Sequence, residues 1–206
     1  MEAPGKGEQT VKGRITPAKG YIVYDPELCT GCRVCEAACS FAKEGCIRPS
    51  LSRIQVQRNP FLGTVENFLP KPCLQCEHPQ CMLACPVEGA MAVDEKTGAR
   101  VINETLCPTD CSQCREACGS YYDPPRILFH PDKKVQVKCD LCAGTPECVK
   151  WCPNGAIRFI NRTELVERGG SYGRSFTEAF VKDFGPTYEP FQGTKWKYRG
   201  PWFKEE

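Results

Sequence analysis

Sixteen of the seventeen cysteines in this chain fall into four similar runs. In each run three closely spaced cysteines are followed, after three further residues, by a fourth. The runs are Cys29, Cys32, Cys35 and Cys39; Cys73, Cys76, Cys81 and Cys85; Cys107, Cys111, Cys114 and Cys118; and Cys139, Cys142, Cys148 and Cys152. Only Cys46 lies outside this pattern, and we interpret it as a buried or free structural thiol. Closely spaced C-x2-C pairs suit metal chelation better than disulfide pairing, and an odd cysteine total also argues against a disulfide scaffold.

The first run reads C-x2-C-x2-C-x3-C. In this spacing three thiolates hold one iron–sulfur cluster and the fourth reaches a neighbouring cluster. Four runs supply sixteen ligands, so we expect four 4Fe-4S clusters. Zinc is a weaker interpretation, because zinc sites group cysteines in pairs and would leave ligands of these triplets unused.

The composition indicates a core in which metal clusters replace part of the usual apolar packing. Hydrophobic residues make up 41% of the 206 residues, but seventeen of them are cysteines. The aliphatic and aromatic core is therefore thin for a chain of this length. We expect clusters to act as core and cross-link together, so that the protein without metal is unfolded or nearly so.

The charge of the chain depends on its metal content. The formal net charge is +2 with neutral thiols. Four clusters with their thiolates add roughly −8, which leaves roughly −6 for the loaded protein. Nucleic-acid binding is therefore not expected. Residues 1–20 lack a secretion signal, and no apolar stretch of about 18 residues is present. We therefore expect no membrane insertion, and we expect the protein to lie in a reducing, low-oxygen cytoplasm.

Short elements are expected between the cysteine runs. Gly31 lies between Cys29 and Cys32, where the backbone turns tightly around a cluster, and Gly98 supplies the positive φ of a hairpin turn. The pattern predicts strands over 21–24, 53–57 and 155–160, a helix over 34–43, and hairpins over 90–102 and 126–137.

Several single residues allow more than one interpretation. His78 lies inside the second run and is expected at the surface or in a hydrogen bond rather than on a cluster. The third run has a longer first gap, so Asp110 is an alternative ligand to Cys107. His130 falls in the turn of the second hairpin and is expected to face solvent. Trp151 either covers a cluster against water or packs in the core.

The two ends of the chain differ from its cysteine-rich centre. Residues 1–20 predict an arm that is disordered or orders on a partner. Residues 161–206 contain no cysteine but many aromatics, including Phe176, Phe180 and Phe184 at helical spacing. This tail either wraps on the protein's own surface or docks on a larger subunit, and docking is the interpretation we favour.

The fold class predicted from this repeat is α+β. Each unit has a strand, a cysteine triplet, a short helix with the fourth cysteine, and a further strand. Two units make one ferredoxin-like module with pseudo-twofold symmetry, so four units make two modules. The hairpin over 90–102 joins runs two and three, and their pairing would leave runs one and four to pair around them. Spacing alone leaves this nested arrangement open.

The details around the runs resemble those of one family. Runs two and four end in Cys85-Pro86 and Cys152-Pro153, each followed by a Gly-Ala strand start, and residues 137–142 read Val-Lys-Cys-Asp-Leu-Cys. Over residues 21–160 the chain looks like the four-cluster electron-transfer beta subunits of molybdopterin oxidoreductases. Members include those of dimethyl sulfoxide reductase, polysulfide reductase and formate dehydrogenase.

This resemblance implies nested modules, the first formed by residues 21–58 with 122–160 and the second by 59–121. It also implies four ligand sets. They are Cys29, Cys32, Cys35 with Cys152; Cys139, Cys142, Cys148 with Cys39; Cys73, Cys76, Cys81 with Cys118; and Cys107, Cys111, Cys114 with Cys85. The set that contains Cys29 would lie nearest a catalytic subunit.

The function implied is single-electron transfer, without catalytic residues of its own, between a larger tungsto- or molybdopterin subunit and a ferredoxin or other redox protein. The chain also looks like the small subunits of cytoplasmic tungsten enzymes of the aldehyde oxidoreductase family, including class II benzoyl-CoA reductase. The alternative is a free-standing soluble polyferredoxin.

Overall fold

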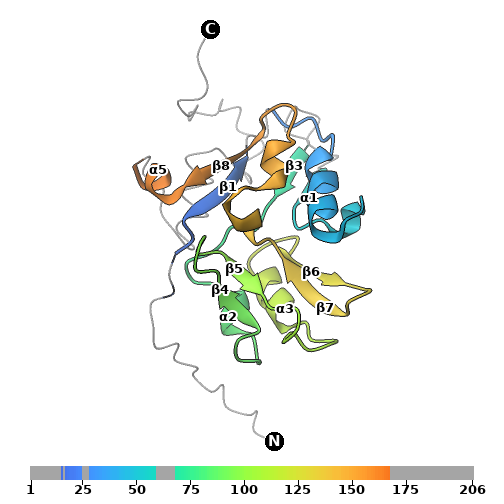
Figure 1. Ribbon diagram of the computed structural model, residues 1–206, viewed down its shortest axis with the longest axis vertical. Coiled ribbons are helices and arrows are strands. Elements are labelled where there is room, and N and C mark those ends of the chain that lie inside the picture. The colour runs from blue at the N-terminus through green and yellow to red at the C-terminus, as the bar shows by residue number, and fades with distance from the viewer. Residues whose placement is uncertain (1–14, 16, 25–27, 59–67, 168–206) are drawn as a thin grey trace, which may run out of the picture.

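The computed structural model describes residues 15, 17–24, 28–58 and 68–167, and Figure 1 shows their course. The strands are β1 (Gly20–Tyr24), β2 (Gln55–Arg58), β3 (Phe68–Lys71), β4 (Met91–Val93), β5 (Arg100–Ile102), β6 (Ile127–His130), β7 (Val135–Lys138) and β8 (Ile157–Asn161). The α-helices are α1 (Val34–Glu44), α2 (Gln80–Leu83), α3 (Gln113–Gly119), α4 (Glu147–Lys150) and α5 (Arg162–Glu167). Two 3-10 turns, η1 (Pro49–Leu51) and η3 (Leu141–Gly144), complete these elements.

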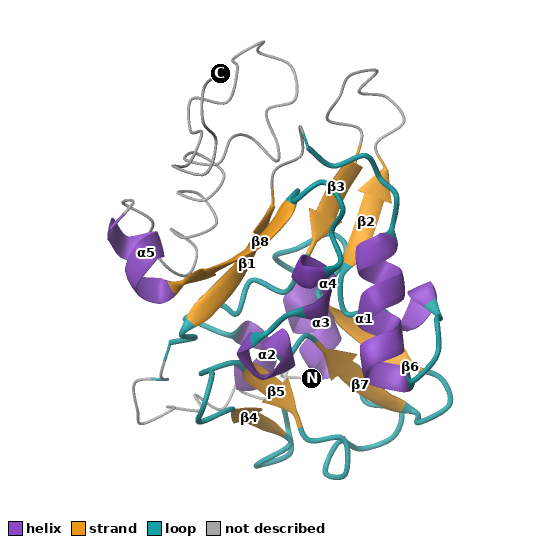
Figure 2. Cartoon of the chain, turned by 45° about the horizontal axis from the view of Figure 1, so that its top comes forward, coloured by secondary structure: helices purple, strands orange, loops and turns teal. Residues whose placement is uncertain are grey.

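The strands of the described residues form four separate two-stranded antiparallel sheets. Three of them, β2–β3, β4–β5 and β6–β7, join strands that follow each other in the chain. The fourth pairs β1 with β8, in a register that sets Gly20 opposite Asn161 and Tyr24 opposite Ile157. This pairing brings the two ends of the cysteine-rich region side by side, as Figures 1 and 2 show.

The helices pack in two pairs that follow the cysteine runs. α1 of the first run contacts α4 of the fourth, and α2 of the second contacts α3 of the third (Figure 2). The hairpin β6–β7 lies against the second pair, since β6 contacts α3 and β7 contacts β5. Cysteines that are distant in sequence therefore come close at two helix pairs.

Cysteines form part of the apolar core, as the thin aliphatic composition led us to expect. The main cluster of buried residues combines β1 and β8 side chains with Cys35, Cys39, Cys73, Cys139 and Cys148. A smaller cluster consists of Cys114, Cys118 and Ile127, with partly buried neighbours. Sulfur atoms thus occupy positions that aliphatic side chains fill in most domains of this size.

Most predicted elements are present. The predicted strand over 21–24 is β1, the helix over 34–43 is α1, the strand over 53–57 is β2, and the strand over 155–160 is β8. Both hairpins are found, as β4–β5 and β6–β7. One strand, β3, was not predicted; it contains Pro70 and pairs with β2. The coarse prediction of a small α+β fold is correct. The aromatic stripe at 176–184 lies outside the described residues.

Two predictions about single residues are wrong. His130 does not face solvent: it ends β6, is only 3% exposed, and its Nε2 lies 3.0 Å from the carboxylate of Glu44. Trp151 does not pack in the core, because it is 57% exposed and its indole N–H donates to Glu147, and it is not among the residues that line the cysteine pockets. A partner from α1 explains the first error, and a local i, i+4 bond on α4 explains the second.

None of the helices in the described part of the chain is long and apolar enough to cross a membrane.

Four cysteine-lined pockets

The structure brings the sixteen predicted ligands together in four pockets with four cysteines in each. In every pocket three cysteines come from one run and the fourth from another. The pockets are lined by Cys29, Cys32, Cys35 and Cys152; by Cys39, Cys139, Cys142 and Cys148; by Cys73, Cys76, Cys81 and Cys118; and by Cys85, Cys107, Cys111 and Cys114. We call them the Cys29, Cys39, Cys73 and Cys85 pockets.

The same backbone turn opens each run. The residue before the second cysteine has positive φ in all four: 70° at Gly31, 49° at Gln75, 63° at Asp110 and 59° at Leu141. This conformation is uncommon outside glycine, and most of all for a residue such as Leu. Its recurrence shows that the extra residue of the third run is absorbed before this position. In the fourth run the positive φ continues through Cys142 and Ala143.

Gly31 is the one glycine among these four positions, and packing explains it. A Cβ built on Gly31 would lie 2.3 Å from the ring of Phe68, at the start of β3. A side chain here would therefore both strain the backbone and displace the phenylalanine.

Backbone N–H groups point at several of the sulfur atoms. The amide of Arg53 donates to Cys39 Sγ at 3.3 Å, and the amide of Arg126 donates to Cys118 Sγ at 3.2 Å. The amide of Leu141 donates to Cys139 Sγ at 3.4 Å, from the turn just described. Such bonds favour a thiolate over a thiol and tune any metal group that the sulfur holds.

Burial acts in the opposite direction on the same sulfurs. Burial, with a smaller contribution from Glu36, raises the pKa of Cys35 to about 12. Burial also raises the pKa of Cys81 and of Cys114 to about 12, and that of Cys148 further. Thiolates at these positions therefore need a compensating positive charge, which a coordinated metal supplies.

The pockets fit iron–sulfur clusters by their donor chemistry. Each offers four sulfur donors, which is the ligand set of a 4Fe-4S cluster. No three His, Cys, Asp or Glu side chains of the described residues converge as they would on a single metal ion. The four cysteines of each set instead surround a hollow, in which a cluster would be held by the thiolates and would carry single electrons.

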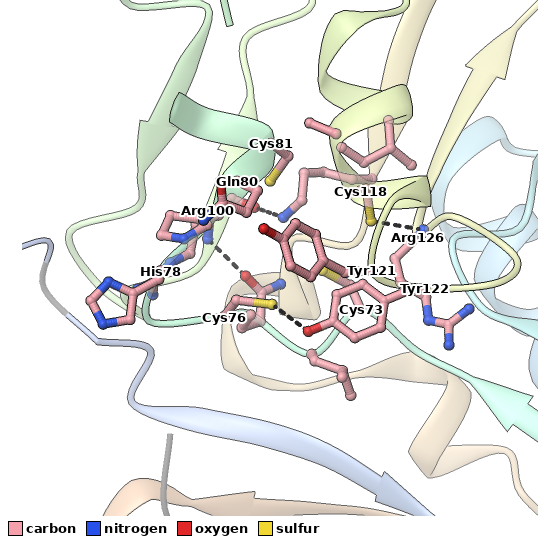
Figure 3. A pocket seen from close by; sticks show the side chains of 16 residues that line it. Cys73, Cys76, His78, Gln80, Cys81, Arg100, Cys118, Tyr121, Tyr122 and Arg126 are labelled. Carbon is pink, nitrogen blue, oxygen red and sulfur yellow. Dashed lines mark hydrogen bonds between the residues drawn. The ribbon is translucent and has the colours of Figure 1, made fainter. Parts of the chain in front are cut away.

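The Cys73 pocket is much larger than the other three. It encloses about 390 Å³, against about 10 to 20 Å³ for the others. Figure 3 shows its cysteines with Arg100, Tyr121, Tyr122 and Arg126 around them. The Tyr122 hydroxyl lies 3.3 Å from Cys76 Sγ, a contact that nothing in the sequence predicted.

Three cations line the Cys73 pocket. Arg100 and Lys138 are 1% and 7% exposed, and Arg126 is partly buried. Burial lowers the pKa of Lys138, but the sulfurs of Cys73, Cys81 and Cys139 raise it more, so the net direction is upward. The neighbouring Lys71 shows that positive charges crowd together here. Burial, followed by repulsion from the charge of Arg126, lowers the pKa of Lys71 to about 8.

Gln75 connects the Cys73 pocket with the Cys39 pocket. Its side chain is 1% exposed, donates to the carbonyl of Cys139 at 2.9 Å, and accepts from the amide of Arg100 at 2.8 Å. A buried amide that satisfies backbone groups of two segments fixes their relative position. The sequence signal was only its place between Cys73 and Cys76.

The alternative candidates differ in their distance from the sulfur sets. Asp110 is exposed and does not line the Cys85 pocket, whereas Cys107 does. His78 is exposed and contributes to the lining of the Cys73 pocket beside its cysteines. Cys46 is exposed and lines none of the four pockets, so the thiol is not buried.

Comparisons with known proteins agree with this geometry. Residues 64–162 match the 4Fe-4S dicluster domain family, and residues 22–41 match the 4Fe-4S binding domain family. The chain is 44% identical over 134 residues to the aliphatic sulfonate oxidoreductase, polyferredoxin-like subunit, of Pyrococcus furiosus, which covers 64% of this chain and 70% of that subunit.

Two further proteins are similar over most of this chain. The beta subunit of NADH-dependent phenylglyoxylate dehydrogenase from Aromatoleum evansii is 32% identical over 73% of this chain, which spans only 32% of that longer subunit. Among solved structures, a chain of the active site complex BamBC of benzoyl coenzyme A reductase with benzoyl-CoA is 26% identical. It covers 81% of this chain and 92% of its own length, with a TM-score of 0.36.

The cysteine sets and these matches define the class as electron-transfer iron–sulfur subunits of oxidoreductases. The chain belongs to the 4Fe-4S dicluster family.

Proposed function

We propose that this protein carries four 4Fe-4S clusters, one in each cysteine-lined pocket, and passes single electrons along them. The observation that carries the proposal is the grouping of sixteen cysteines into four sets of four. Each set combines three cysteines of one run with one from another run, as expected for paired clusters that exchange their fourth ligand. Run one shares pockets with run four, and run two shares pockets with run three.

The proposed modules are nested in the sequence. The first consists of residues 21–58 with 122–160, and the second of residues 59–121. Support comes from the antiparallel pairing of β1 with β8 and from the contacts of α1 with α4 and of α2 with α3.

The residues of this chain bind the clusters and set their surroundings. Thiolates hold the iron, while amides such as those of Arg53 and Arg126 donate to ligand sulfurs and stabilise their negative charge. The buried apolar residues around β1 and β8 exclude water from the sites. No general acid or base is required, because electron transfer between clusters breaks no bond to hydrogen.

The proposed partner is a larger tungsto- or molybdopterin catalytic subunit on one side and a ferredoxin or other redox protein on the other. The similarity to a polyferredoxin-like subunit of an oxidoreductase supports a catalytic partner. The choice of tungsten or molybdenum rests on the resemblance of the cysteine runs and their flanking residues. We place the Cys29 pocket nearest the catalytic subunit, and Cys32, which is exposed, lies at that pocket's surface.

The proposed setting is a low-oxygen cytoplasm. Sixteen cysteines reserved for iron require reducing conditions, because oxidants convert free thiolates to disulfides or sulfenic acids.

Native purification under anaerobic conditions tests the proposal. We expect about sixteen irons per chain, a brown colour, and a larger subunit with tungsten or molybdenum that copurifies with the chain. An iron content near twelve per chain would mean that the protein carries three clusters rather than four. Zinc in place of iron would overturn the proposal altogether.

The same purification separates this proposal from a free polyferredoxin. A diffusible carrier would return alone with full iron content, and its electrons would pass to a partner only through transient encounters. In that outcome the four-cluster function stands and the fixed catalytic partner is wrong.

A further inference from the structure

The four pockets have the same sulfur ligands but differ in the charges around them. The described residues that line the Cys85 pocket include no charged side chain. The Cys29 pocket has the exposed Arg33, and the carboxylate of Glu36, 5% exposed, lies beside its cysteine Cys35. Neither pocket therefore presents a buried positive charge to its contents.

The Cys39 pocket has cations, but acidic partners neutralise them. Lys43 forms a salt bridge of 2.7 Å with Asp140, and both residues line the pocket. Arg53 also lines it and forms a buried salt bridge of 2.5 Å with Glu44. Each positive charge is thus balanced within a few ångströms.

The Cys73 pocket has three cations and no acid among its described lining residues. Lys138 donates to the backbone carbonyls of Arg100 and Cys139. Arg100 donates to the carbonyl of Gly98, while its buried Nε and Nη2 have no partner among the described residues. Arg126 donates to the carbonyl of Pro124 and lies 5.6 Å above the ring of Tyr122. None of the salt bridges of the described residues involves these three side chains.

Two acids lie close to these cations in the chain order, and neither lines the Cys73 pocket. Asp140, two residues after Lys138, lines the Cys39 pocket and is paired with Lys43. Asp123 acts on the charge of Lys71, but it is exposed and does not line the pocket. Solvent screens an exposed carboxylate far more than it screens the buried cations.

Uncompensated cations have a direct consequence for a cluster in this pocket. Reduction adds one negative charge to a cluster that is already negative with its thiolates. Positive side chains in a region of low dielectric stabilise the reduced form more than the oxidised form. Hydrogen bonds such as that of the Tyr122 hydroxyl to Cys76 act in the same direction.

We propose that Arg100, Arg126 and Lys138 make the cluster of the Cys73 pocket the most easily reduced of the four. This inference rests on the proposed four-cluster function. When one electron passes to this cluster, a reduced 4Fe-4S cluster of the same chain is oxidised by one electron, and no proton or covalent bond moves. The three cations act only by stabilising the reduced form of the cluster. Electrons therefore collect at the cluster of the Cys73 pocket.

Redox titration of the purified holoprotein, followed by electron paramagnetic resonance, tests the inference. Lys138→Gln removes one buried charge and retains a hydrogen-bond donor. We expect the highest of the four midpoint potentials to fall, with a reduction equilibrium constant at least about tenfold smaller, or about 59 mV. The other three potentials and the iron content should stay as in the wild type. Cys118→Ser identifies the signal, because it alters the spectrum of the same cluster.

A matched control uses the compensated pocket. The double variant Lys43→Gln with Asp140→Asn removes one positive and one negative charge at the Cys39 pocket. Its net charge is unchanged, so we expect no comparable shift of any midpoint potential. A fall in a midpoint potential as large as that of Lys138→Gln would show that charge compensation does not decide the order of the four midpoint potentials.

A second variant tests the inference in case Lys138→Gln does not fold. Arg126 is only partly buried, so Arg126→Gln should fold even if a substitution at Lys138 does not, and it should lower the same midpoint. Full iron content with unchanged midpoints in the Lys138 and Arg126 variants would overturn the inference and leave the four-cluster function intact. A wild-type protein with markedly fewer than sixteen irons would instead overturn the proposed function.

Discussion

The Cys39 and Cys73 pockets meet at one buried side chain, that of Gln75, yet their surroundings are opposite in character. The Cys39 pocket is tight, and its cations are paired with carboxylates. The Cys73 pocket is roomy, and among the described residues its cations contact carbonyls, a ring and a cysteine sulfur but form no salt bridge with a carboxylate. The same four-sulfur ligand set can thus be placed in a neutral or in a positive environment within one small fold.

This difference teaches that the ligands and the electrostatics have separate origins in the chain. Cysteines of the runs provide the ligands, whereas the charges come from elements outside the runs: Arg100 begins β5, Lys138 ends β7 and Arg126 precedes β6. Substitutions outside the cysteine runs should therefore tune potentials without changing which metal group is bound.

Removal of a ligand from the tight pocket should have the largest effect. Cys148 is 5% exposed, lies on α4 and packs in the main core cluster. Cys148→Ser should remove about four irons and much of the folded population, because the cluster is also a cross-link of the core. Iron analysis and circular dichroism of the anaerobic protein measure both losses. The matched control is Cys46→Ser, at the exposed cysteine outside the pockets, and it should retain all iron.

Loss of charge compensation at the Cys39 pocket should rank second. Glu44, whose side chain is 8% exposed, pairs with Arg53 and His130. Glu44→Gln leaves Arg53 as an unbalanced buried charge and should lower the free energy of unfolding by about 3 kcal/mol. The midpoint potential of the Cys39 cluster should rise at the same time, and so approach that of the Cys73 cluster.

Glu104 offers a matched control for this variant. Lys133 pairs with both acids, but Glu104 has a 40% exposed side chain. Glu104→Gln should change the free energy of unfolding by less than about 1 kcal/mol. Equal losses in the two variants, measured by denaturant titration of the holoprotein, would contradict a special role for the buried acid.

The junction between the two pockets should respond less strongly. Gln75→Leu keeps a similar size but leaves the Arg100 amide and the Cys139 carbonyl without their partner. We expect a loss of about 2 kcal/mol in the free energy of unfolding, because both groups are buried. Denaturant titration measures it, and iron content should be unchanged. A stable variant would mean that solvent or the chain itself satisfies these groups.

Tyr122→Phe should have the smallest effect. It removes the hydroxyl that lies 3.3 Å from Cys76 Sγ and leaves the ring below Arg126 in place. The midpoint potential of the Cys73 cluster should fall, but by less than in Lys138→Gln, because a neutral hydroxyl is lost rather than a full charge. A larger fall than that of Lys138→Gln would mean that this hydrogen bond, rather than the cations, is the main cause of the high midpoint potential of the Cys73 cluster.

Much of the fold follows from local sequence signals. Gly98 marked the β4–β5 hairpin correctly, since its φ is 69°. The strand β3 was not predicted from Phe68–Lys71, because this segment contains a proline and proline argues against any strand that is not at the edge of a sheet. In a two-stranded sheet both strands are edges, so the penalty does not apply. The positive φ at Leu141 could not be predicted, because its residue type disfavours that conformation.

The errors at single residues have different causes. His130 was assigned to solvent because it adjoins a turn, but it is buried and its ring hydrogen-bonds to Glu44, which lies 86 residues away in the sequence. Trp151 was expected inside because it precedes Cys152, but its indole is held on the surface by Glu147. His130 is thus placed by a contact between segments far apart in the chain, which the local pattern does not contain. Trp151 is placed by a local i, i+4 bond, which lies within reach of the sequence.

The sequence by itself determined the chemistry of this protein. Cysteine spacing is a local property, and the requirement of iron for four thiolates makes it readable without a fold. The tertiary structure decided which cysteines share a pocket, through the β1–β8 pairing and the two helix pairs. It also decided the charge at each pocket, because Arg100, Arg126 and Lys138 come together from separate segments. Electrostatic energy depends on distance and burial, and neither is encoded in the spacing of the ligands.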